Sequence, residues 1–192
     1  MSSSPNPYFS DPDVGLMLDF QNGSTAAFEM LMEKYYRRIL NFIYRYSGNK
    51  ERAEDLTQEV FIKVYHHGKD YRPTAQFRTW LYTIAKNLSL NELKRHHHRA
   101  VSIDEPQTVE TLKDHAPYPD KVLADQEMAR AIKTAISDLP ENQRMAVILR
   151  RYEDFSYEEI AETMGVSLQA VKSLLNRAKD NLRLKLEKFI RE

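Results

Sequence analysis

The sequence contains no cysteine, which excludes disulfide frameworks, zinc ribbons, thiol nucleophiles and iron–sulfur clusters. A chain without cysteine suits a reducing compartment, so we expect a cytoplasmic location. Glycine is scarce, at five residues of 192, and the absence of a phosphate-binding P-loop motif excludes an ATP-driven motor of that type. No window approaches the run of about 18 apolar residues that spans a bilayer, so we expect no stable membrane insertion. The first residues, MSSSPNPYFSDPD, lack the basic and apolar segments of a secretory signal.

Helix-forming sequence is what the chain has in abundance. Apolar residues make up 42% and charged residues 29%, enough for packed cores, and Leu, Lys, Arg, Glu, Met, Ala and Gln dominate. No segment alternates with period two, so we predict an all-α fold without a sheet. The pattern divides the chain into a loose N-terminal arm (1–12), a helical bundle (13–98), a proline-bearing linker (99–125) and a second helical domain (126–192).

A net charge of zero conceals an uneven distribution. Residues 100–127 carry seven acids against two bases, whereas residues 166–192 carry seven bases against three acids. A second basic cluster precedes the linker and consists of Lys86, Lys94, Arg95 and Arg99, with His96, His97 and His98 between the last two. We therefore expect two small helical domains, joined by a flexible acidic linker, that each offer a basic surface to a polyanion.

Apolar periodicity predicts three helices in the first domain, over residues 28–46, 50–67 and 77–97. Ser24 is suited to cap the first of these helices, and Gly48 lies just beyond its end. Gly68 ends the second helix. Short connections between the three helices are typical of a bundle.

Two stripes run side by side along the third predicted helix. The apolar stripe consists of Phe77, Leu81, Ile84 and Leu88. The stripe beside it consists of Trp80, Thr83, Asn87, Asn91 and Lys94. An indole, amides and a lysine on an open face suit base-edge and stacking contacts with nucleic acid. The alternative, a buried Trp80 beside merely solvated amides, stays open.

The segment SYEEIAETMGVSLQAVKSLLNRAKDNLRLKL has the spacing of a helix-turn-helix. Gly165 supplies the turn, Ala161 the small residue at the helix crossing, and Ser167 a cap for the second helix. We expect its core to contain Ile160, Met164, Val166, Val171 and Leu174. The opposite face carries groups suited to major-groove edges and phosphates, namely Gln169, Lys172, Ser173, Asn176 and Arg177. Helices over 128–139 and 141–152, separated by Pro140, support the motif.

Four segments in order resemble the extracytoplasmic-function (ECF) group of bacterial RNA polymerase sigma factors. They are DPDVGLMLDFQNGSTAAFEMLMEKYYRRI, AEDLTQEVFIKVYHH, FRTWLYTIAKNLSLNELKR and DLPENQRMAVILRRYEDFSYEEIAETMGVSLQAVKSLLNRAKDNL, and the resemblance covers residues 11–186. It implies an alternative sigma factor that binds core RNA polymerase, recognises promoter DNA and opens it. It implies no covalent chemistry and no cofactor. Members of the group often have an inhibitory anti-sigma factor as a further partner.

The resemblance also implies roles for individual residues. Contacts with the polymerase clamp would come from Asp55, Gln58, Glu59 and Phe61, while Leu56 and Val60 stay in the core. Reading and melting of the minus-ten element would use Tyr71, Arg72, Thr74, Phe77, Trp80, Thr83, Lys86, Asn87, Asn91, Lys94 and Arg95. Of these, the first three lie in a loop over residues 69–76 that would hold a flipped base. Reading of the minus-thirty-five element would use Ser167, Gln169, Lys172, Ser173, Asn176 and Arg177. Asn91 stands where the family often has an acid, and the position of Asn176 is variable in the family, so the promoter sequence does not carry over.

Three other classes of protein compete with this interpretation. A helix-turn-helix regulator that acts without polymerase accounts for the C-terminal half but not for AEDLTQEVF followed by FRTWLYTIAKN. A helical protein-binding adaptor would use the basic C-terminal helix for a partner. An enzyme is disfavoured because the histidines stand mostly at adjacent positions and no HExxH or GxSxG motif accompanies them, so we predict no catalytic residue and no metal site.

Overall fold

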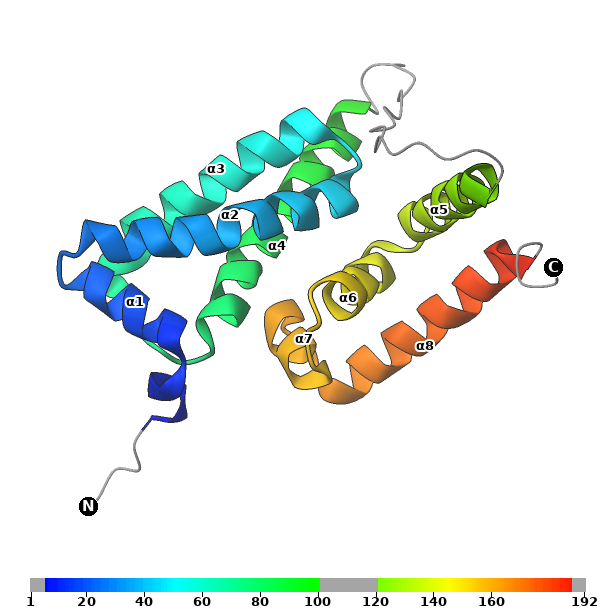
Figure 1. The fold of residues 1–192 in the computed structure, drawn as a ribbon. Coiled ribbons are helices and arrows are strands. Elements are labelled where there is room, and N and C mark those ends of the chain that lie inside the picture. The colour runs from blue at the N-terminus through cyan, green and yellow to red at the C-terminus, as the bar shows by residue number, and fades with distance from the viewer. Residues whose placement is uncertain (1–5, 101–120, 188–192) are drawn as a thin grey trace. The chain divides into compact units, whose positions relative to one another are not determined.

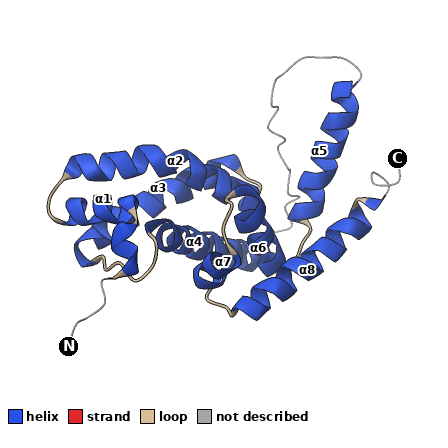
Figure 2. Ribbon diagram, turned by 60° about the horizontal axis from the view of Figure 1, so that its bottom comes forward, coloured by secondary structure: helices blue, strands red, loops and turns tan. Residues whose placement is uncertain are grey.

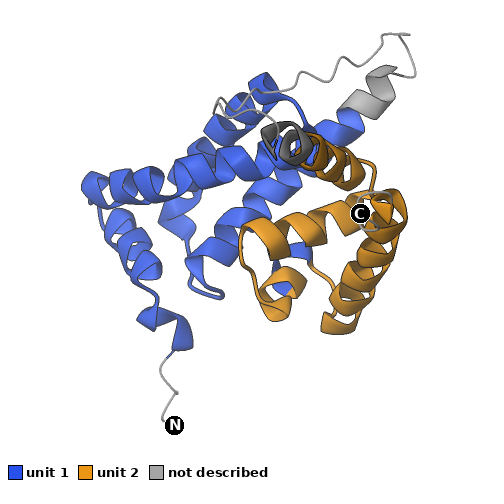
Figure 3. Ribbon diagram, turned by 45° about the vertical axis from the view of Figure 1, so that its right-hand side comes forward, with its two compact units in different colours: residues 1–105, 162–164 blue, residues 106–161, 165–192 orange. Residues whose placement is uncertain are grey.

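The computed structural model describes the backbone of residues 6–100 and 121–187, and the side chains of residues 6–95 and 127–187. All regular structure in these ranges is helical, which confirms the predicted all-α class (Figure 2). The chain divides into two compact units, Met1–Glu105 with Glu162–Met164 and Pro106–Ala161 with Gly165–Glu192 (Figure 3). The central part of the expected linker lies outside the described residues. The ends of that range are helical, because α4 extends to Ala100 and α5 begins at Lys121.

The first unit contains η1 (Pro7–Ser10), α1 (Pro12–Gln21), α2 (Thr25–Ser47), α3 (Lys50–His67), η2 (Gly68–Asp70) and α4 (Phe77–Ala100). The helices α2 and α3 form a hairpin, and α4 packs against both (Figure 1). The helices predicted over 28–46, 50–67 and 77–97 are therefore confirmed: α2 begins directly after the predicted cap Ser24, and α4 ends three residues later than expected.

Local sequence accounts for the ends of α2. The Ser24 hydroxyl accepts a hydrogen bond from the backbone N–H of Ala27 (3.3 Å), which satisfies one of the open donors of the first turn. Gly48 closes the helix in the left-handed conformation, with φ 72°, which a residue without Cβ adopts at little cost. Both predicted caps are confirmed.

The core of the first unit lies where the apolar faces of α2, α3 and α4 meet. Its side chains include Ile39, Phe42, Ile43, Tyr46, Ala53, Leu56, Val60, Val64, Phe77, Leu81 and Tyr82, all buried. Burial of Leu56 and Val60 confirms their predicted place in the core. Phe42 meets Tyr82 edge-on, with ring centroids 5.1 Å apart, so aromatic packing joins α2 to α4.

The N-terminal segment differs from the loose arm expected over residues 1–12. Asn6 caps η1 through its side chain, and Asp11 caps α1 by accepting from the backbone N–H of Asp13 (3.0 Å). The first turn of α1 thus begins at Pro12, a residue favoured there because it lacks an N–H to satisfy. Two capping side chains give residues 6–12 a defined backbone that composition did not reveal.

The second unit contains α5 (Lys121–Ser137), α6 (Glu141–Tyr152), α8 (Leu168–Lys185) and all of α7 (Tyr157–Met164) except its last three residues. A reciprocal capping box begins α7, because the backbone N–H of Ser156 donates to Glu159 (2.7 Å) and that of Glu159 donates to the Ser156 hydroxyl (3.1 Å). The Asn181 amide on α8 donates to the Gln143 side-chain oxygen on α6 (2.8 Å), which joins these two helices beside their apolar contact.

The predicted helix-turn-helix is formed by α7 and α8. Gly165 has φ 67°, and Ser167 accepts from the backbone N–H of Ala170 (3.1 Å), which confirms the predicted turn and cap. Ile160, Ala161 and Val171 are buried as expected, whereas Met164 and Leu174 are half-buried. The expectation for Val166 is wrong: its side chain is 38% exposed, because the residue lies in the turn just outside the helix crossing.

Candidate nucleic-acid and protein interfaces

The outer face of α3 presents polar and apolar side chains together. Asp55, Gln58 and Glu59 are exposed on it, and Glu59 lies 3.8 Å from the Lys63 ammonium. Phe61, predicted from the resemblance as a fourth contact, is buried at 4% exposure and stacks on Tyr36, with centroids 5.8 Å apart. Its ring therefore supports this face from beneath.

Two apolar side chains complete the α3 outer face and were missed from the sequence. Ile62 and Tyr65 are 55% and 50% exposed. They follow Asp55 at intervals of seven and ten residues, so continuing the helical spacing beyond Gln58 would have found them. We define the α3 outer face as Asp55, Gln58, Glu59, Ile62 and Tyr65. Exposed apolar groups among acids and amides are the composition of a protein-binding surface.

The loop over residues 69–76 alternates between inward and outward side chains. Tyr71 and Ala75 are buried, whereas Arg72, Thr74 and Gln76 are exposed. The structure therefore separates the three loop residues implied by the resemblance, since Arg72 and Thr74 face solvent and Tyr71 does not. Burial, and to a lesser degree the Asp11 carboxylate, raise the pKa of the Tyr71 hydroxyl above its ordinary range.

An aromatic cluster joins this loop to the start of α4. The Tyr71 ring meets Trp80 edge-on at 4.9 Å between centroids, and Phe77 lies 5.8 Å from Trp80. Phe77 is fully buried and Tyr71 nearly so, while Trp80 is half-buried. Of the three rings, only the indole keeps accessible surface, so it is the one available to a base.

The α4 stripe, defined as Trp80, Thr83, Asn87, Asn91 and Lys94, becomes more exposed toward its C-terminal end. Thr83 is half-buried, with its hydroxyl donating to the Thr79 carbonyl (2.8 Å), whereas the last three residues are exposed. Lys86 and Arg95 flank the stripe. Burial lowers the pKa of the half-buried Lys86 ammonium, and a phosphate near it would raise that pKa again by stabilising the charged form. Side chains 96–98 lie outside the described residues.

The α8 outer face is defined as Gln169, Lys172, Ser173, Asn176 and Arg177. Four of these side chains are exposed and Ser173 is half-buried, while Val171 and Ala178 on the opposite side are fully buried. Ser167 is exposed at the N-terminal end of the helix and serves as its cap. Lys185 at the other end pairs with Asp138 (2.9 Å), which fastens α8 beside the end of α5. The helix thus presents a row of donors and acceptors on a rigid support.

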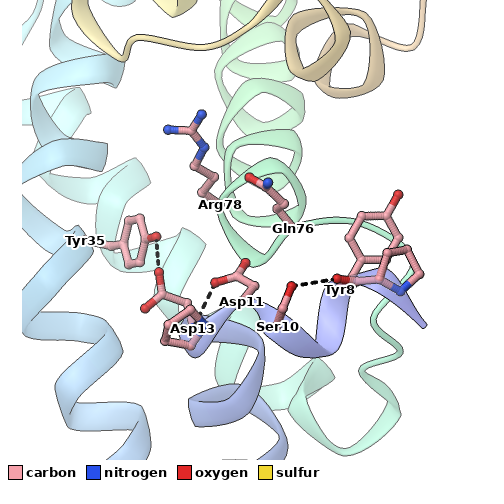
Figure 4. Close-up of a pocket in the computed structure, with 9 residues that line it drawn as sticks. Tyr8, Ser10, Asp11, Asp13, Tyr35, Gln76 and Arg78 are labelled. Atoms are coloured by element: carbon pink, nitrogen blue, oxygen red, sulfur yellow. Dashed lines mark hydrogen bonds between the residues drawn. The ribbon is translucent and has the colours of Figure 1, made fainter. Parts of the chain in front are cut away.

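A polar hollow of about 430 Å³ opens between η1, α1, α2 and the start of α4 (Figure 4). Its two carboxylates are occupied by internal contacts. Asp13 is buried and accepts hydrogen bonds from the Tyr35 hydroxyl and the Lys34 ammonium, each at 2.6 Å. Asp11 accepts from the backbone N–H groups of Asp13 and Phe77, both at 3.0 Å. The hollow is therefore lined by a structural network that fastens α1 to α2 and α4.

Among the side chains that the structure describes, no cluster of three or more His, Cys, Asp or Glu residues has the arrangement of a metal site. No described helix is both long enough and apolar enough to cross a membrane.

Family models match both units. Sigma-70 region 2 matches residues 31–99, and Sigma-70 region 4 matches residues 129–182. The first match covers α3, the 69–76 loop and the α4 stripe, and the second covers the helix-turn-helix.

Curated relatives match nearly the whole chain. The ECF RNA polymerase sigma factor SigE of Mycolicibacterium smegmatis is 33% identical over 186 residues, which cover 95% of this chain and 72% of the relative. The RNA polymerase sigma-H factor of Pseudomonas aeruginosa is 33% identical over 190 residues, covering 95% and 97%. The ECF RNA polymerase sigma-E factor of Escherichia coli is 33% identical over 186 residues, covering 93% and 96%.

Solved structures share the fold. CnrH, in complex with the cytosolic domain of CnrY, superposes with a TM-score of 0.70 at 22% identity and covers 93% of this chain and 99% of its own. The sigma factor RpoE of Bartonella quintana, in complex with the anti-sigma factor NepR, has a TM-score of 0.69 at 24% identity and covers 83% and 96%.

Proposed function

Since this chain belongs to the extracytoplasmic-function group of RNA polymerase sigma factors, we propose that its polymerase and promoter contacts divide among three exposed surfaces. The protein acts with RNA polymerase as an alternative sigma factor. In this proposal the α3 outer face binds the polymerase clamp, the 69–76 loop and the α4 stripe read and open the minus-ten element, and the α8 outer face reads the minus-thirty-five element. The protein works in the cytoplasm and performs no covalent chemistry.

The observation that carries the division is the exposure of three chemically distinct faces on helices whose opposite sides are buried. On α3, carboxylates and an amide surround exposed Ile62 and Tyr65, which suits a partner protein with basic and apolar groups. On α8, amides and bases make up the outer face between Gln169 and Arg177, which suits the major groove, and the exposed Leu184 lies beyond this face toward the C-terminal end of the helix. Phe61 is assigned a supporting role because its ring is buried.

Strand opening then depends on binding energy alone. Extruding a base costs a few kcal/mol, which stacking and hydrogen bonds in a protein pocket must offset. Trp80 supplies the stacking surface, and Arg72 and Thr74 supply outward donors on the adjacent loop. Tyr71 and Phe77 hold the indole from its buried side. Lys86, Lys94 and Arg95 hold the phosphates of the unpaired strand.

Binding to core polymerase without DNA tests the protein interface. Labelled protein is titrated with bacterial core polymerase and followed by anisotropy, and we expect saturable binding that a principal sigma factor displaces. Asp55→Ala and Ile62→Ala weaken it, whereas Asp19→Ala, which removes an exposed acid from α1, leaves it unchanged. Phe61→Ala is unsuitable because truncating a buried ring costs about 3–5 kcal/mol of folding stability. A folded chain that does not bind core polymerase but binds duplex DNA would instead be a helix-turn-helix regulator. A folded chain that binds neither would be an adaptor.

The single tryptophan reports directly on the minus-ten site. Because Trp80 is the only tryptophan in the chain, all of the indole emission comes from this site. Single-stranded DNA that stacks on Trp80 is therefore expected to quench this emission. Lys172→Ala and Arg177→Ala leave this quenching and core binding intact but weaken recognition of the upstream duplex. One folded variant that lost polymerase and upstream DNA together would contradict the division of surfaces.

The relatives of known structure point to a further partner class. CnrH and RpoE were each solved with a second protein, which for RpoE is the anti-sigma factor NepR. By the same fold, this chain is expected to bind an anti-sigma factor that competes with core polymerase. Competition between a co-expressed candidate inhibitor and core polymerase in the anisotropy assay tests this expectation.

A further inference from the structure

Alternate carbonyl groups of the 69–76 loop accept hydrogen bonds from two amide side chains of the N-terminal segment. The Gln21 amide donates to the carbonyl of Lys69 (2.7 Å) and to that of Tyr71 (3.2 Å). The Asn6 amide donates to the carbonyl of Pro73 (2.7 Å). These partners lie 48 to 67 positions apart in the sequence, so local folding of the loop does not provide them.

The same segment also holds both ends of the loop. At the start, the Phe20 ring lies against Gly68 so closely that a Cβ there would be 2.9 Å from Phe20 Cδ1 and 3.2 Å from Met17 Cε. At the end, the Asp11 carboxylate accepts from the backbone N–H of Phe77 (3.0 Å), a donor that the first turn of α4 leaves open.

Within itself the loop is weakly constrained. The backbone hydrogen bonds that the structure records for residues 71–76 as donors are those from Tyr71 to the Gly68 carbonyl (3.2 Å) and from Thr74 to the Arg72 carbonyl (2.8 Å). Tyr71 and Ala75 anchor it from the buried side. Because side chains alternate along an extended segment, the direction of the carbonyls at 71 and 73 also decides where Arg72 and Thr74 point, while Lys69 offers its carbonyl from η2 at the start of the loop.

We infer that Asn6, Asp11, Phe20 and Gln21 form an N-terminal brace that sets the conformation of the 69–76 loop for reading a minus-ten base. The inference rests on the proposed role of that loop. Asn6 and Gln21 are positioning residues, since they bind loop carbonyls and leave the outward face to the DNA. Their bonds are exposed or half-exposed and contribute little to folding, so removing them loosens the loop without unfolding the unit.

The brace is tested by base discrimination. Wild-type protein with core polymerase is bound to a single-stranded DNA library randomised across the minus-ten region, and the retained sequences give a preference ratio at each position. The double variant Asn6→Ala/Gln21→Ala is compared with Asn22→Ala, an exposed amide beside Gln21 for which the structure records no side-chain hydrogen bond. Gln21→Glu is a second probe, because it keeps the shape but turns a carboxylate toward two carbonyl oxygens.

We expect the double variant to lose about fivefold or more in the preference ratio at the most selective position, the smallest discrimination that a good base contact provides. Core-polymerase affinity stays at the wild-type value, and the thermal midpoint falls only by the loss of the cap that Asn6 also provides for η1. Asn22→Ala keeps the wild-type preference ratio, core affinity and thermal midpoint. Arg72→Ala and Thr74→Ala lower the ratio at the same position, which ties the effect to the loop.

Three results overturn the brace. If Arg72→Ala lowers the preference but the double variant does not, the loop reads DNA without the brace and the proposed function stands. If the double variant weakens binding to every sequence equally, its role is structural only. If neither the loop variants nor the brace variants change any preference, the loop does not read bases, and the proposed function fails at this site together with the brace.

Discussion

Replacing Gly68 by alanine tests whether the approach of α1 to the loop is as close as the structure shows. The backbone of Gly68 is ordinary right-handed helix, with φ −57° and ψ −35°, so alanine meets no strain from its own dihedral angles. The added Cβ meets the Phe20 ring and Met17 instead. Phe20 is held on its other sides by Phe28 and Tyr65, with centroids 4.8 and 5.3 Å away.

The expected cost follows from these contacts. Overpacking by one methyl group costs about 1–3 kcal/mol where neighbours cannot retreat, and each aromatic pair that the ring leaves is worth about 0.5–1.5 kcal/mol. Alanine also stabilises the folded state by about 0.4–1 kcal/mol, because it lowers the conformational entropy of the unfolded chain. We therefore expect Gly68→Ala to lower the free energy of unfolding by about 1–2 kcal/mol, or the thermal midpoint by about 4–8 °C for each kcal/mol.

Urea unfolding monitored by Trp80 fluorescence measures this cost, because the only tryptophan in the chain reports the unfolding of the first unit alone. Gly15→Ala is the matched control: Gly15 is also helical, but a Cβ there meets nothing within 4 Å, so this variant gains stability. In a Phe20→Leu background, Gly68→Ala should cost less, because the ring edge is gone and the contact with Met17 remains. A Gly68→Ala protein as stable as the wild type, or one that Phe20→Leu does not relieve, would refute the close approach.

Three further outcomes are expected. Ser167→Ala removes the cap of α8 and lowers the thermal stability of the second unit by about 1 kcal/mol, read by circular dichroism, while exposed Ser137→Ala does not. Because the pKa of Tyr71 is raised above its ordinary 10.0, the unfolded chain releases a proton that the folded chain keeps, so stability falls as pH rises above about 10. Tyr71→Phe removes this buried hydroxyl, which has no hydrogen-bond partner. The variant should therefore lose less unfolding free energy than the wild type between about pH 9 and 11, as measured by urea unfolding. An equal pH dependence in the two proteins would contradict this expectation. Lys86→Ala lowers the slope of minus-ten DNA affinity against salt concentration by about one phosphate contact, whereas Lys50→Ala, which removes a base that pairs with Glu54 on α3, leaves this slope unchanged.

Helix positions in this protein were largely predictable because they depend on local signals. Ser24, Gly48, Gly165 and Ser167 act through their own backbone geometry or through a hydrogen bond within three residues, so their roles follow from sequence spacing. The residues around Asn6 and Asp11 escaped prediction because proline and serine suggested a loose arm, while their caps and long-range bonds become visible only in the folded chain.

The candidate sites divide in the same way. Periodicity predicted which face of α8 is exposed, since a buried Val171 and Ala178 oblige the opposite side to face solvent. Periodicity placed Phe77 on the apolar stripe of its helix, but the resemblance assigned Phe61, Tyr71 and Phe77 to contact surfaces. All three rings lie beneath those surfaces, because an aromatic residue packs inward or outward according to what the neighbouring helices offer. Ile62 and Tyr65 remain about half exposed, although the Tyr65 ring also contacts Phe20 and Phe28.

Sequence alone determined the all-helical class, the helix-turn-helix and the family of this protein, because caps, spacing and motifs act over short distances along the chain. Tertiary structure decided which aromatic ring a base can reach and how the 69–76 loop is held. Gly68 shows the reason most clearly. The sequence suggests a helix terminator, yet the residue has right-handed dihedral angles, and the close approach of Phe20, 48 positions away, is what excludes a larger side chain.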